Sequence, residues 1–259
     1  MQIGASTSNF YPLLTEQALD LVLQAGFRQT EIFFNASSEL SHPFVRDLRH
    51  RLDDTGAAAV AIHPYTSFME PYFLFSVYER RAQDMLEEYK REFEAAAMLG
   101  ASYLVLHGES ERSTLTMEQS LERYEQLYDL GMTFGVRVAQ ENVVRYRSAD
   151  LAYLQAMRDT LKEKAAFVLD VKQCVRCGLS IEQVAQAMGD HIVHVHVSDH
   201  DDVCDCLPPG TGTFDYARLF SLLRERHYDG ALILELYRAG FHDEQDLIAA
   251  ASYLETFIR

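Results

Sequence analysis

Short apolar segments alternate with longer amphipathic segments along the whole chain. The apolar segments are typical of buried β-strands, and we expect eight of them, at residues 2–6, 29–34, 58–63, 102–107, 136–141, 166–171, 191–197 and 231–236. Each precedes a segment with helical periodicity, at residues 15–26, 41–56, 77–99, 116–134, 148–163, 180–188, 214–227 and 243–258. Eight strand–helix units in series predict an α/β protein, a single (β/α)8 TIM barrel.

A doubly wound open sheet is the alternative architecture for such an alternation. Sheets of that kind usually carry a glycine-rich phosphate loop after the first strand, and Gly4-Ala-Ser-Thr-Ser lacks its spacing. No Pro/Gly-rich linker or change of composition divides the 259 residues. Single barrels of about 250 residues are common. We therefore expect one domain over residues 1–259.

Polar residues fall late in several of the predicted strands. In residues 191–197, Val193, Val195 and Val197 share one face, whereas His194 and His196 share the other. One face can thus pack under helices while the other lines the barrel. TIM barrels carry their active site at the C-terminal mouth of the strands, which is where these polar residues fall.

Three of the apolar segments end in a carboxylate, at Glu141, Asp170 and Glu235, and His196 lies near the end of a fourth. A buried carboxylate is costly unless it is paired, and a shared cation would remove that cost. We therefore predict one divalent metal ion bound by these four residues. Carboxylates with one imidazole suit Mn, Mg, Co or Zn. The alternative is that they are ordinary polar residues at strand ends.

Charge and hydropathy narrow the classes of partner. The chain has 39 acidic and 23 basic residues, a net charge of −16, which disfavours binding to nucleic acid. No apolar run approaches the roughly 20 residues of a membrane span. The N-terminal residues 1–6 have no basic region or apolar core of a signal peptide. We expect a soluble, cytoplasmic protein that does not act at a membrane.

The order and spacing of several motifs resemble a known family, the xylose isomerase-like TIM barrels, over nearly the whole chain. That family includes sugar isomerases and epimerases, inosose dehydratases and the AP endonuclease family 2 enzymes such as endonuclease IV. The motifs that carry the resemblance are Ile3-Gly-Ala, Ala61-Ile-His-Pro-Tyr65, Leu104-Val-Leu-His-Gly108, Gln140-Glu-Asn-Val143, Leu169-Asp-Val-Lys-Gln173, His194-Val-His-Val-Ser-Asp199, Leu207-Pro-Pro-Gly-Thr-Gly212 and Ile233-Leu-Glu-Leu-Tyr237.

The resemblance implies a metal-dependent sugar isomerase or epimerase of carbohydrate metabolism. Glu141, Asp170, His196 and Glu235 match the shared metal ligands of the family. The substrate would be a small sugar, sugar phosphate or polyol ketone that reacts through a cis-enediolate, with Glu141 and Glu235 as the acid/base pair. An inosose-type dehydratase could use the same residues, and the sequence does not choose between these reactions.

Four further residues are assigned to the substrate pocket. His63 and His107 match positions that line this pocket in epimerase-like relatives and that bind extra metals in the endonuclease IV branch. Many family members have a histidine where this chain has Gln173, which cannot act as an acid or base near neutral pH. The neighbouring Lys172 could bind a carboxylate, a phosphate or an enolate.

The missing histidine also weakens the endonuclease interpretation, because a three-metal cluster needs it. A non-catalytic binding protein is the remaining alternative. Retention of all four ligands speaks against it, since a barrel without chemistry would gain stability by losing buried charge.

Two smaller features stay open. Cys174, Cys177, Cys204 and Cys206 are expected in the loops after the sixth and seventh strands, where they either hold a structural zinc or are unliganded. The aromatic residues Phe68, Tyr72 and Phe73 follow the third strand. They would either cover a sugar or contact a second subunit in a homo-oligomer.

Overall fold

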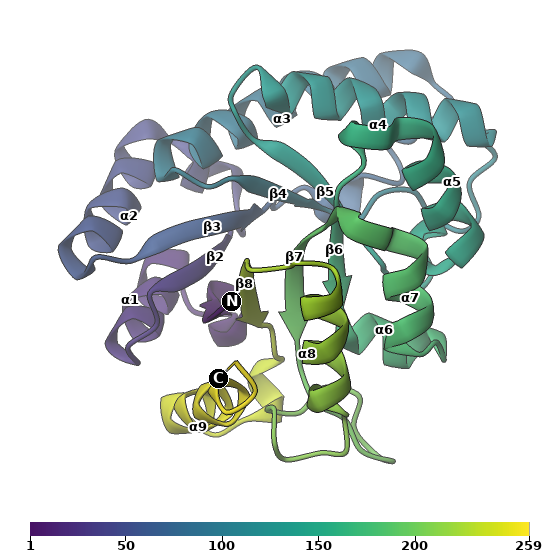
Figure 1. Ribbon diagram of the computed structural model, residues 1–259. Coiled ribbons are helices and arrows are strands. Elements are labelled where there is room, and N and C mark those ends of the chain that lie inside the picture. Colours follow the sequence, from purple (N-terminus) through teal and green to yellow (C-terminus); the bar gives the residue numbers. More distant parts are fainter. Residues whose placement is uncertain (259) are drawn as a thin grey trace.

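Eight parallel strands form a closed barrel in the computed structural model, which describes residues 1–258. Each strand pairs with the next, and β8 pairs with β1 to close the circle (Figure 1). The strands are β1 (Gln2–Ser6), β2 (Gln29–Phe33), β3 (Ala58–His63), β4 (Tyr103–Leu106), β5 (Arg137–Glu141), β6 (Phe167–Asp170), β7 (Ile192–Val197) and β8 (Ala231–Leu234). The predicted TIM barrel is therefore confirmed.

The helices surround the barrel, as Figure 1 shows. Eight of them follow the strands within a few residues of the expected positions: α1 (Thr15–Gln24), α2 (His42–Thr55), α3 (Glu79–Leu99), α4 (Met117–Met132), α5 (Leu151–Leu161), α7 (Ile181–Met188), α8 (Tyr216–Glu225) and α9 (Glu244–Glu255). Short 3-10 helices lie in the connections: η1 (Thr7–Phe10), η2 (Ser37–Leu40), η3 (Ser67–Met69), η4 (Arg147–Ala149), η5 (Lys162–Lys164), η6 (Gly189–His191) and η7 (Arg238–Gly240).

An additional helix, α6 (Val171–Cys177), follows β6 without a loop, and the sequence pattern did not predict it. Asp170, the last residue of β6, is its N-cap and accepts a hydrogen bond from the backbone N–H of Gln173 at 2.8 Å. The helix ends at Gly178, which adopts a left-handed conformation with φ 65°. Strand end and helix start thus share one carboxylate.

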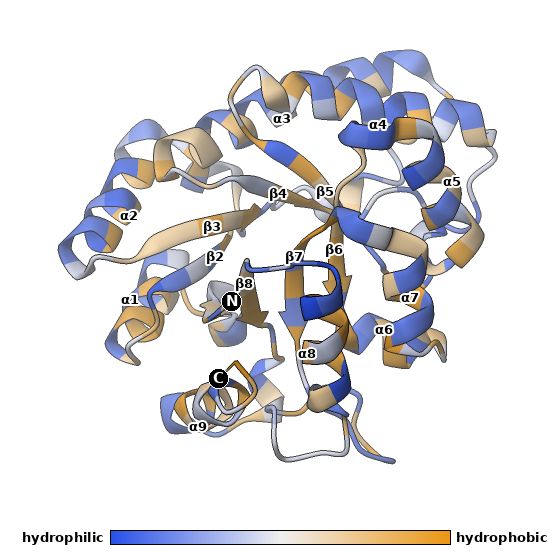
Figure 2. Cartoon of the chain, viewed as in Figure 1, coloured by the Kyte–Doolittle hydropathy of each residue, from blue (hydrophilic) through white to orange (hydrophobic). Residues whose placement is uncertain are grey.

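The main hydrophobic core lies between the strands and the surrounding helices. Figure 2 shows hydrophobic residues along the strands and mixed colours along the helices, which present one apolar and one polar face. A second, small apolar cluster contains Ala61, Val105, Ala139, Ala166 and Val168. These mostly small side chains fill the barrel interior and leave the strand ends to polar residues. Within residues 1–258, no helix is long and apolar enough to cross a membrane.

Candidate active site

The four predicted metal ligands converge at the C-terminal ends of β5 to β8. Glu141 ends β5, Asp170 ends β6, His196 lies in β7 and Glu235 directly follows β8. Nδ1 of His196 lies 3.7 Å from Oε1 of Glu141, 3.5 Å from Oδ2 of Asp170 and 3.5 Å from Oε2 of Glu235. Closure of the barrel therefore brings together side chains that are about one strand–helix unit apart in sequence.

The atoms at the centre of this group fit a cation. Oδ2 of Asp170 and Nδ1 of His196 are buried and have no hydrogen-bond partner within the described part of the chain. Such unpartnered buried atoms are rare and costly, so each one requires a physical explanation. One ligand atom from each of the four residues lies within 4.8 Å of the others. This set of three carboxylates and one imidazole suits a divalent metal ion.

A fifth buried acid, Glu31 of β2, holds the imidazole of His196 from behind. Its Oε2 accepts hydrogen bonds from Nε2 of His196 and Nε2 of His194, each at 3.0 Å. Because Nε2 of His196 is directed at Glu31, Nδ1 of the same ring faces the carboxylates of Glu141, Asp170 and Glu235, which is the orientation that a metal-ligating imidazole requires. His194 lies two residues before His196 in β7 and is thus a hydrogen-bonded core histidine.

The electrostatics of Glu31 support this arrangement. Burial pushes the pKa of the Glu31 carboxyl upward, but the two imidazoles outweigh it and lower the pKa well below the ordinary value. Glu31 is consequently an anion that fixes the ring orientation of His196. Sequence reasoning missed this residue. The available signal was a charged residue in the middle of a predicted strand, because a buried acid requires a partner.

His107 and His63 lie beside Glu141 on the other side of the group. Nε2 of His107 is 3.2 Å from Oε2 of Glu141 and 3.0 Å from Nε2 of His63. Nδ1 of His63 is in turn 3.1 Å from the hydroxyl of Ser67, and its ring stacks on Phe33 with centroids 4.4 Å apart. A chain of polar groups therefore leads from Glu141 to the loop after β3.

The pKa values of the two histidines shift in opposite directions. Burial, followed by the neighbouring His107, lowers the pKa of His63 to about 4, so its ring is neutral at pH 7. Burial also opposes the charge of His107, but the carboxylate of Glu141 outweighs it and raises the pKa of His107. Burial raises the pKa of Glu141, but His107 and His196 outweigh it and lower this pKa well below the ordinary value, which favours the ionised carboxylate.

Lys172 lies in the first turn of α6 and contacts Glu235, whereas His107 contacts Glu141. Its Nζ is 2.8 Å from Oε2 of Glu235 and 3.8 Å from Oδ2 of Asp170. The ammonium also lies over the ring of Tyr237, 5.0 Å from the centroid. Burial raises the pKa of Glu235, but Lys172 and then His196 outweigh it and lower the pKa. The lysine therefore stabilises the anionic form of this carboxylate.

Gln173 connects α6 to the loop after β5. Its side-chain oxygen accepts a hydrogen bond from the backbone N–H of Val144 at 3.1 Å. Its own backbone N–H is the one that Asp170 caps. The amide thus holds two neighbouring active-site loops together while it also faces the cavity.

A cavity of about 400 Å³ opens above these groups. All four residues assigned to the substrate pocket line it, together with Glu141 and Glu235; its wall consists of Ser8, Tyr11, Phe33, Asn35, His63, His107, Glu141, Lys172, Gln173, Glu235, Leu236 and Tyr237. Volumes of 300–1,000 Å³ are usual for small-molecule sites. We call this space the catalytic cavity.

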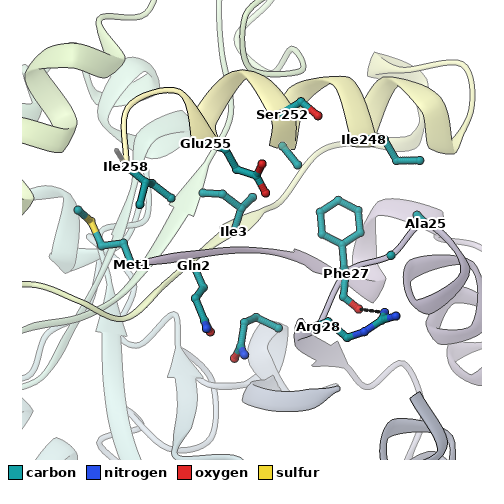
Figure 3. A pocket seen from close by; sticks show the side chains of 13 residues that line it. Met1, Gln2, Ile3, Ala25, Phe27, Arg28, Ile248, Ser252, Glu255 and Ile258 are labelled. Atoms are coloured by element: carbon teal, nitrogen blue, oxygen red, sulfur yellow. Dashed lines mark hydrogen bonds between the residues drawn. The ribbon is translucent and has the colours of Figure 1, made fainter. Parts of the chain in front are cut away.

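A larger cavity, of about 530 Å³, lies at the opposite end of the barrel, between β1, the start of β2 and α9. Figure 3 shows that its walls are mostly apolar side chains such as Met1, Ile3, Phe27 and Ile258. The guanidinium of Arg28 is bound to the carbonyl of its neighbour Phe27 at 3.0 Å. Because titratable groups do not converge there, size alone does not identify the active site.

The cysteines do not form a second centre in the described residues. Cys174 and Cys177 lie in α6 rather than in a loop, which corrects the sequence-based placement. Cys174 is buried, and its sulfur contacts Nδ2 of Asn142 at 3.4 Å. Within residues 1–258, the groups of side chains that could hold a metal contain no cysteine. All four thiols are free.

Known proteins with related sequences include an epimerase and an isomerase. The chain is 24% identical over 253 residues to the 3-dehydro-D-guloside 4-epimerase of Escherichia coli strain K12, with 91% of this chain and 92% of that protein covered. It is also 24% identical over 178 residues to the inosose isomerase of Bacillus subtilis strain 168, with 63% of this chain covered. The match spans 64% of the length of that isomerase.

Solved structures share the fold over the full length. A D-tagatose 3-epimerase-like protein superposes with a TM-score of 0.81 at 17% identity and covers 100% of this chain and 97% of its own. The IOLI protein with a bound zinc atom superposes with a TM-score of 0.79 at 19% identity, with 99% and 97% covered. The sequence pattern of one family matches residues 19–257. The chain belongs to the xylose isomerase-like TIM barrel family.

Proposed function

We propose that this protein is a divalent-metal-dependent isomerase or epimerase of a small sugar or polyol ketone. The observation that carries the proposal is the pair of carboxylates Glu141 and Glu235, which line one cavity on either side of unpartnered Asp170 Oδ2 and His196 Nδ1. The E. coli and B. subtilis relatives, an epimerase and an isomerase, support the same reaction class.

The metal ligands in this proposal are Glu141, Asp170, His196 and Glu235. A bound divalent ion would supply Lewis acidity to a carbonyl oxygen and thereby acidify the neighbouring C–H bond. Glu31 keeps the imidazole of His196 in the ligating orientation. Mn, Mg, Co and Zn all suit these donors.

The acid/base chemistry falls to Glu141 and Glu235. A general base must be ionised at the working pH, and the pKa values of both carboxyls are held below the ordinary value, by His107 and His196 at Glu141 and by Lys172 and His196 at Glu235, against the opposing effect of burial. β6 and β7 separate the strands that carry them. One carboxylate can therefore remove a proton from one face of a substrate while the other returns it to the opposite face.

The site of proton return decides the product. Return to the same carbon from the opposite face inverts that carbon and gives epimerisation. Return to the neighbouring carbon gives aldose–ketose isomerisation. His63 and His107, which line the cavity near Glu141, are placed to bind substrate hydroxyls, and Lys172 is placed to bind an oxygen that gains negative charge.

An inosose-type dehydratase is a second candidate on the same site, and one observation favours it. Nε2 of His107 lies 3.2 Å from Oε2 of Glu141, and this carboxylate outweighs burial and raises the pKa of His107, which favours a proton on the ring beside the carboxylate that removes the substrate hydrogen. Such a proton could protonate a leaving hydroxyl. Cleavage of a phosphodiester lacks comparable support, because Lys172 is the single lysine or arginine among the described residues that line the cavity.

Hydrogen exchange tests the removal of the hydrogen next to the carbonyl, a step that these reactions share. We expect Mn²⁺-loaded protein, incubated in D2O with a panel of ketoses and inososes, to incorporate deuterium next to the carbonyl of its substrate, as measured by NMR. Glu141→Gln and Glu235→Gln should each slow product formation by about 10²–10⁴-fold, because each removes a general acid/base. Loss of one water from the product would select the dehydratase.

The control is Glu111→Gln, which changes an exposed acid in the loop after β4 and should leave the rate unchanged. If the two active-site variants retain the rate of the wild type, the acid/base assignment is wrong. If no compound in the panel exchanges hydrogen, the proposed reaction class is wrong.

A further inference from the structure

A second cavity, of about 440 Å³, adjoins the catalytic cavity. The two share the lining residues Tyr11, Phe33, Asn35 and His107, so they form one continuous space. We call the second cavity the annex. Its further aromatic residues are Tyr65 and Phe68 after β3 and Tyr146 after β5. The annex is therefore formed by loops at the catalytic mouth of the barrel.

The annex presents aromatic faces that lack a protein partner. Phe68 is 69% exposed and Tyr11 is 62% exposed, although both are large apolar side chains. Tyr146 stands at the boundary of the two cavities, with its ring edge-on to that of His107 at 5.7 Å. Clustered exposed aromatics mark binding sites. Flat aromatic faces pack well against the C–H faces of a sugar ring, because both are apolar and rigid.

The charges of the combined space favour an uncharged ligand. Among the described residues that line either cavity, Lys172 is the single cationic lysine or arginine, and Glu235 already neutralises it at 2.8 Å. The nearby Arg176 is paired with Asp205, and Arg147 is paired with Glu109. Away from the metal ligands, a phosphate or carboxylate substituent would therefore find no unpaired lysine or arginine among these residues, and would lie near the buried carboxylates.

We propose that the substrate is an uncharged ketose joined to a second ring, and that the annex binds this second ring. The inference rests on the proposed function, since it places the reacting ketose in the catalytic cavity. It deepens that proposal by naming the substrate class. A single monosaccharide would leave the aromatic wall of the annex uncovered, whereas a ketose that keeps its carbonyl free and carries a second ring on one of its hydroxyls would cover both cavities.

The test compares four neutral or charged probes by calorimetry on Mn²⁺-loaded protein: D-fructose, D-fructose 6-phosphate, and the fructose disaccharides lactulose and isomaltulose, which carry the second ring at different positions. We expect at least one disaccharide to bind on the order of tenfold more tightly than fructose, which is one aromatic stacking contact in free energy. Fructose 6-phosphate should bind more weakly than fructose.

A pair of variants in the loop after β3 locates the effect. Phe68→Ala should reduce the affinity ratio of disaccharide to fructose toward one. Tyr78→Ala removes an exposed aromatic that lies outside both cavities and should preserve the ratio. Equal affinities for fructose and both disaccharides, an equal loss for all sugars in Phe68→Ala, or preference for the phosphate would each overturn the inference.

Two further measurements test whether a second copy of the chain covers the annex and whether the reaction proceeds without the second ring. Sedimentation of wild type and Phe68→Ala shows whether a second copy of the chain covers the annex, and a dimer that dissociates in the variant would overturn a sugar subsite. Deuterium incorporation into fructose without preference for a disaccharide would refute the inference and keep the proposed function. Absence of both binding and exchange for every probe would refute both.

Discussion

The orientation of His196 depends on Glu31, which lies across the barrel interior. Both imidazoles of β7 donate to one oxygen of Glu31, and this leaves Nδ1 of His196 directed at Asp170 and Glu235. Outer-shell carboxylates of this kind fix the tautomer of a ligating histidine and raise its basicity.

Glu31→Gln should therefore weaken metal binding by about 10–100-fold without removing a ligand, because a neutral amide holds the imidazole less firmly. Titration of the metal-free protein with Mn²⁺ measures the change. Glu16→Gln, on the outer helix α1, is the control and should bind Mn²⁺ like the wild type. An unchanged dissociation constant in Glu31→Gln would contradict the assigned role.

The convergence of the four candidate ligands could be predicted from sequence, whereas the contact of Glu31 with His196 could not. Glu141, Asp170 and Glu235 each end an apolar strand, and His196 stands on the barrel-facing side of a fourth, so local pattern and fold suffice. Glu31 acts on β7 from β2, and these strands are not neighbours in the barrel. Strand periodicity gives the face of each residue, but not which residue lies opposite across the interior.

The loop between β7 and α8 is organised by one carboxylate, that of Asp199. Its two oxygens accept hydrogen bonds from the backbone N–H groups of His200 and Phe214 on one side and of Gly210 and Gly212 on the other, at 2.8–3.1 Å. From the sequence, Leu207-Pro-Pro-Gly-Thr-Gly212 in this loop is one of the motifs that carry the family resemblance. The sequence did not show that a single buried acid holds the loop.

Asp199→Ala should lower the free energy of unfolding by on the order of 3 kcal/mol, because four backbone donors lose a charged acceptor. Urea unfolding measures this loss. Asp202→Ala, an exposed change in the same loop, should have little effect. Equal stabilities of the two variants would show that the Asp199 contacts do not hold the loop.

Helix α3 carries a buried acid, Glu92, whose two oxygens have no hydrogen-bond partner among the described residues. Burial, and then the nearby Glu88, raise the pKa of Glu92 from 4.5 to about 8. The folded protein thus keeps a proton that the unfolded chain loses above pH 4.5. The contribution of protonated Glu92 to the free energy of unfolding is complete below pH 4.5 and is lost as the pH rises through about 8.

Glu92→Gln should remove this loss, since the amide does not ionise. We expect the stability difference between variant and wild type to grow between pH 5 and pH 9 by about 4 kcal/mol in favour of the variant. Urea unfolding across this pH range measures the difference. Glu87→Gln, an exposed change on the same helix, should show no such trend. A difference that is independent of pH would refute the buried, protonated acid.

Helix α6 shows why one element was missed. Val171–Cys177 is only seven residues long and follows β6 directly, and its N-cap is the metal-ligand candidate Asp170 itself. Local pattern alone does not separate a strand that continues from a short helix that begins at once. The helix matters for the site, because its first turn places Lys172 on Glu235.

The eight alternating units were sufficient to predict the whole barrel from sequence, because parallel strands in such a series close in only a few ways. The shape of the cavities could not be predicted in this way. The catalytic cavity and the annex are lined by the segments after β1, β2, β3, β4, β5 and β8 and by the first turn of α6. The conformations of such segments depend on contacts that sequence periodicity does not report.

Metal stoichiometry tests the central claim most directly. Protein purified without chelator, then incubated with Mn²⁺, Co²⁺, Mg²⁺ or Zn²⁺ and desalted, is analysed by plasma mass spectrometry beside the double variant Asp170→Ala/Glu235→Ala. A folded control carries Asp54→Ala/Glu255→Ala, two exposed acids away from the site. We predict one tightly bound ion per chain in wild type and control and none in the active-site variant. Absence of metal from the wild type under all four conditions, or full retention of the ion by the active-site variant, would contradict the account.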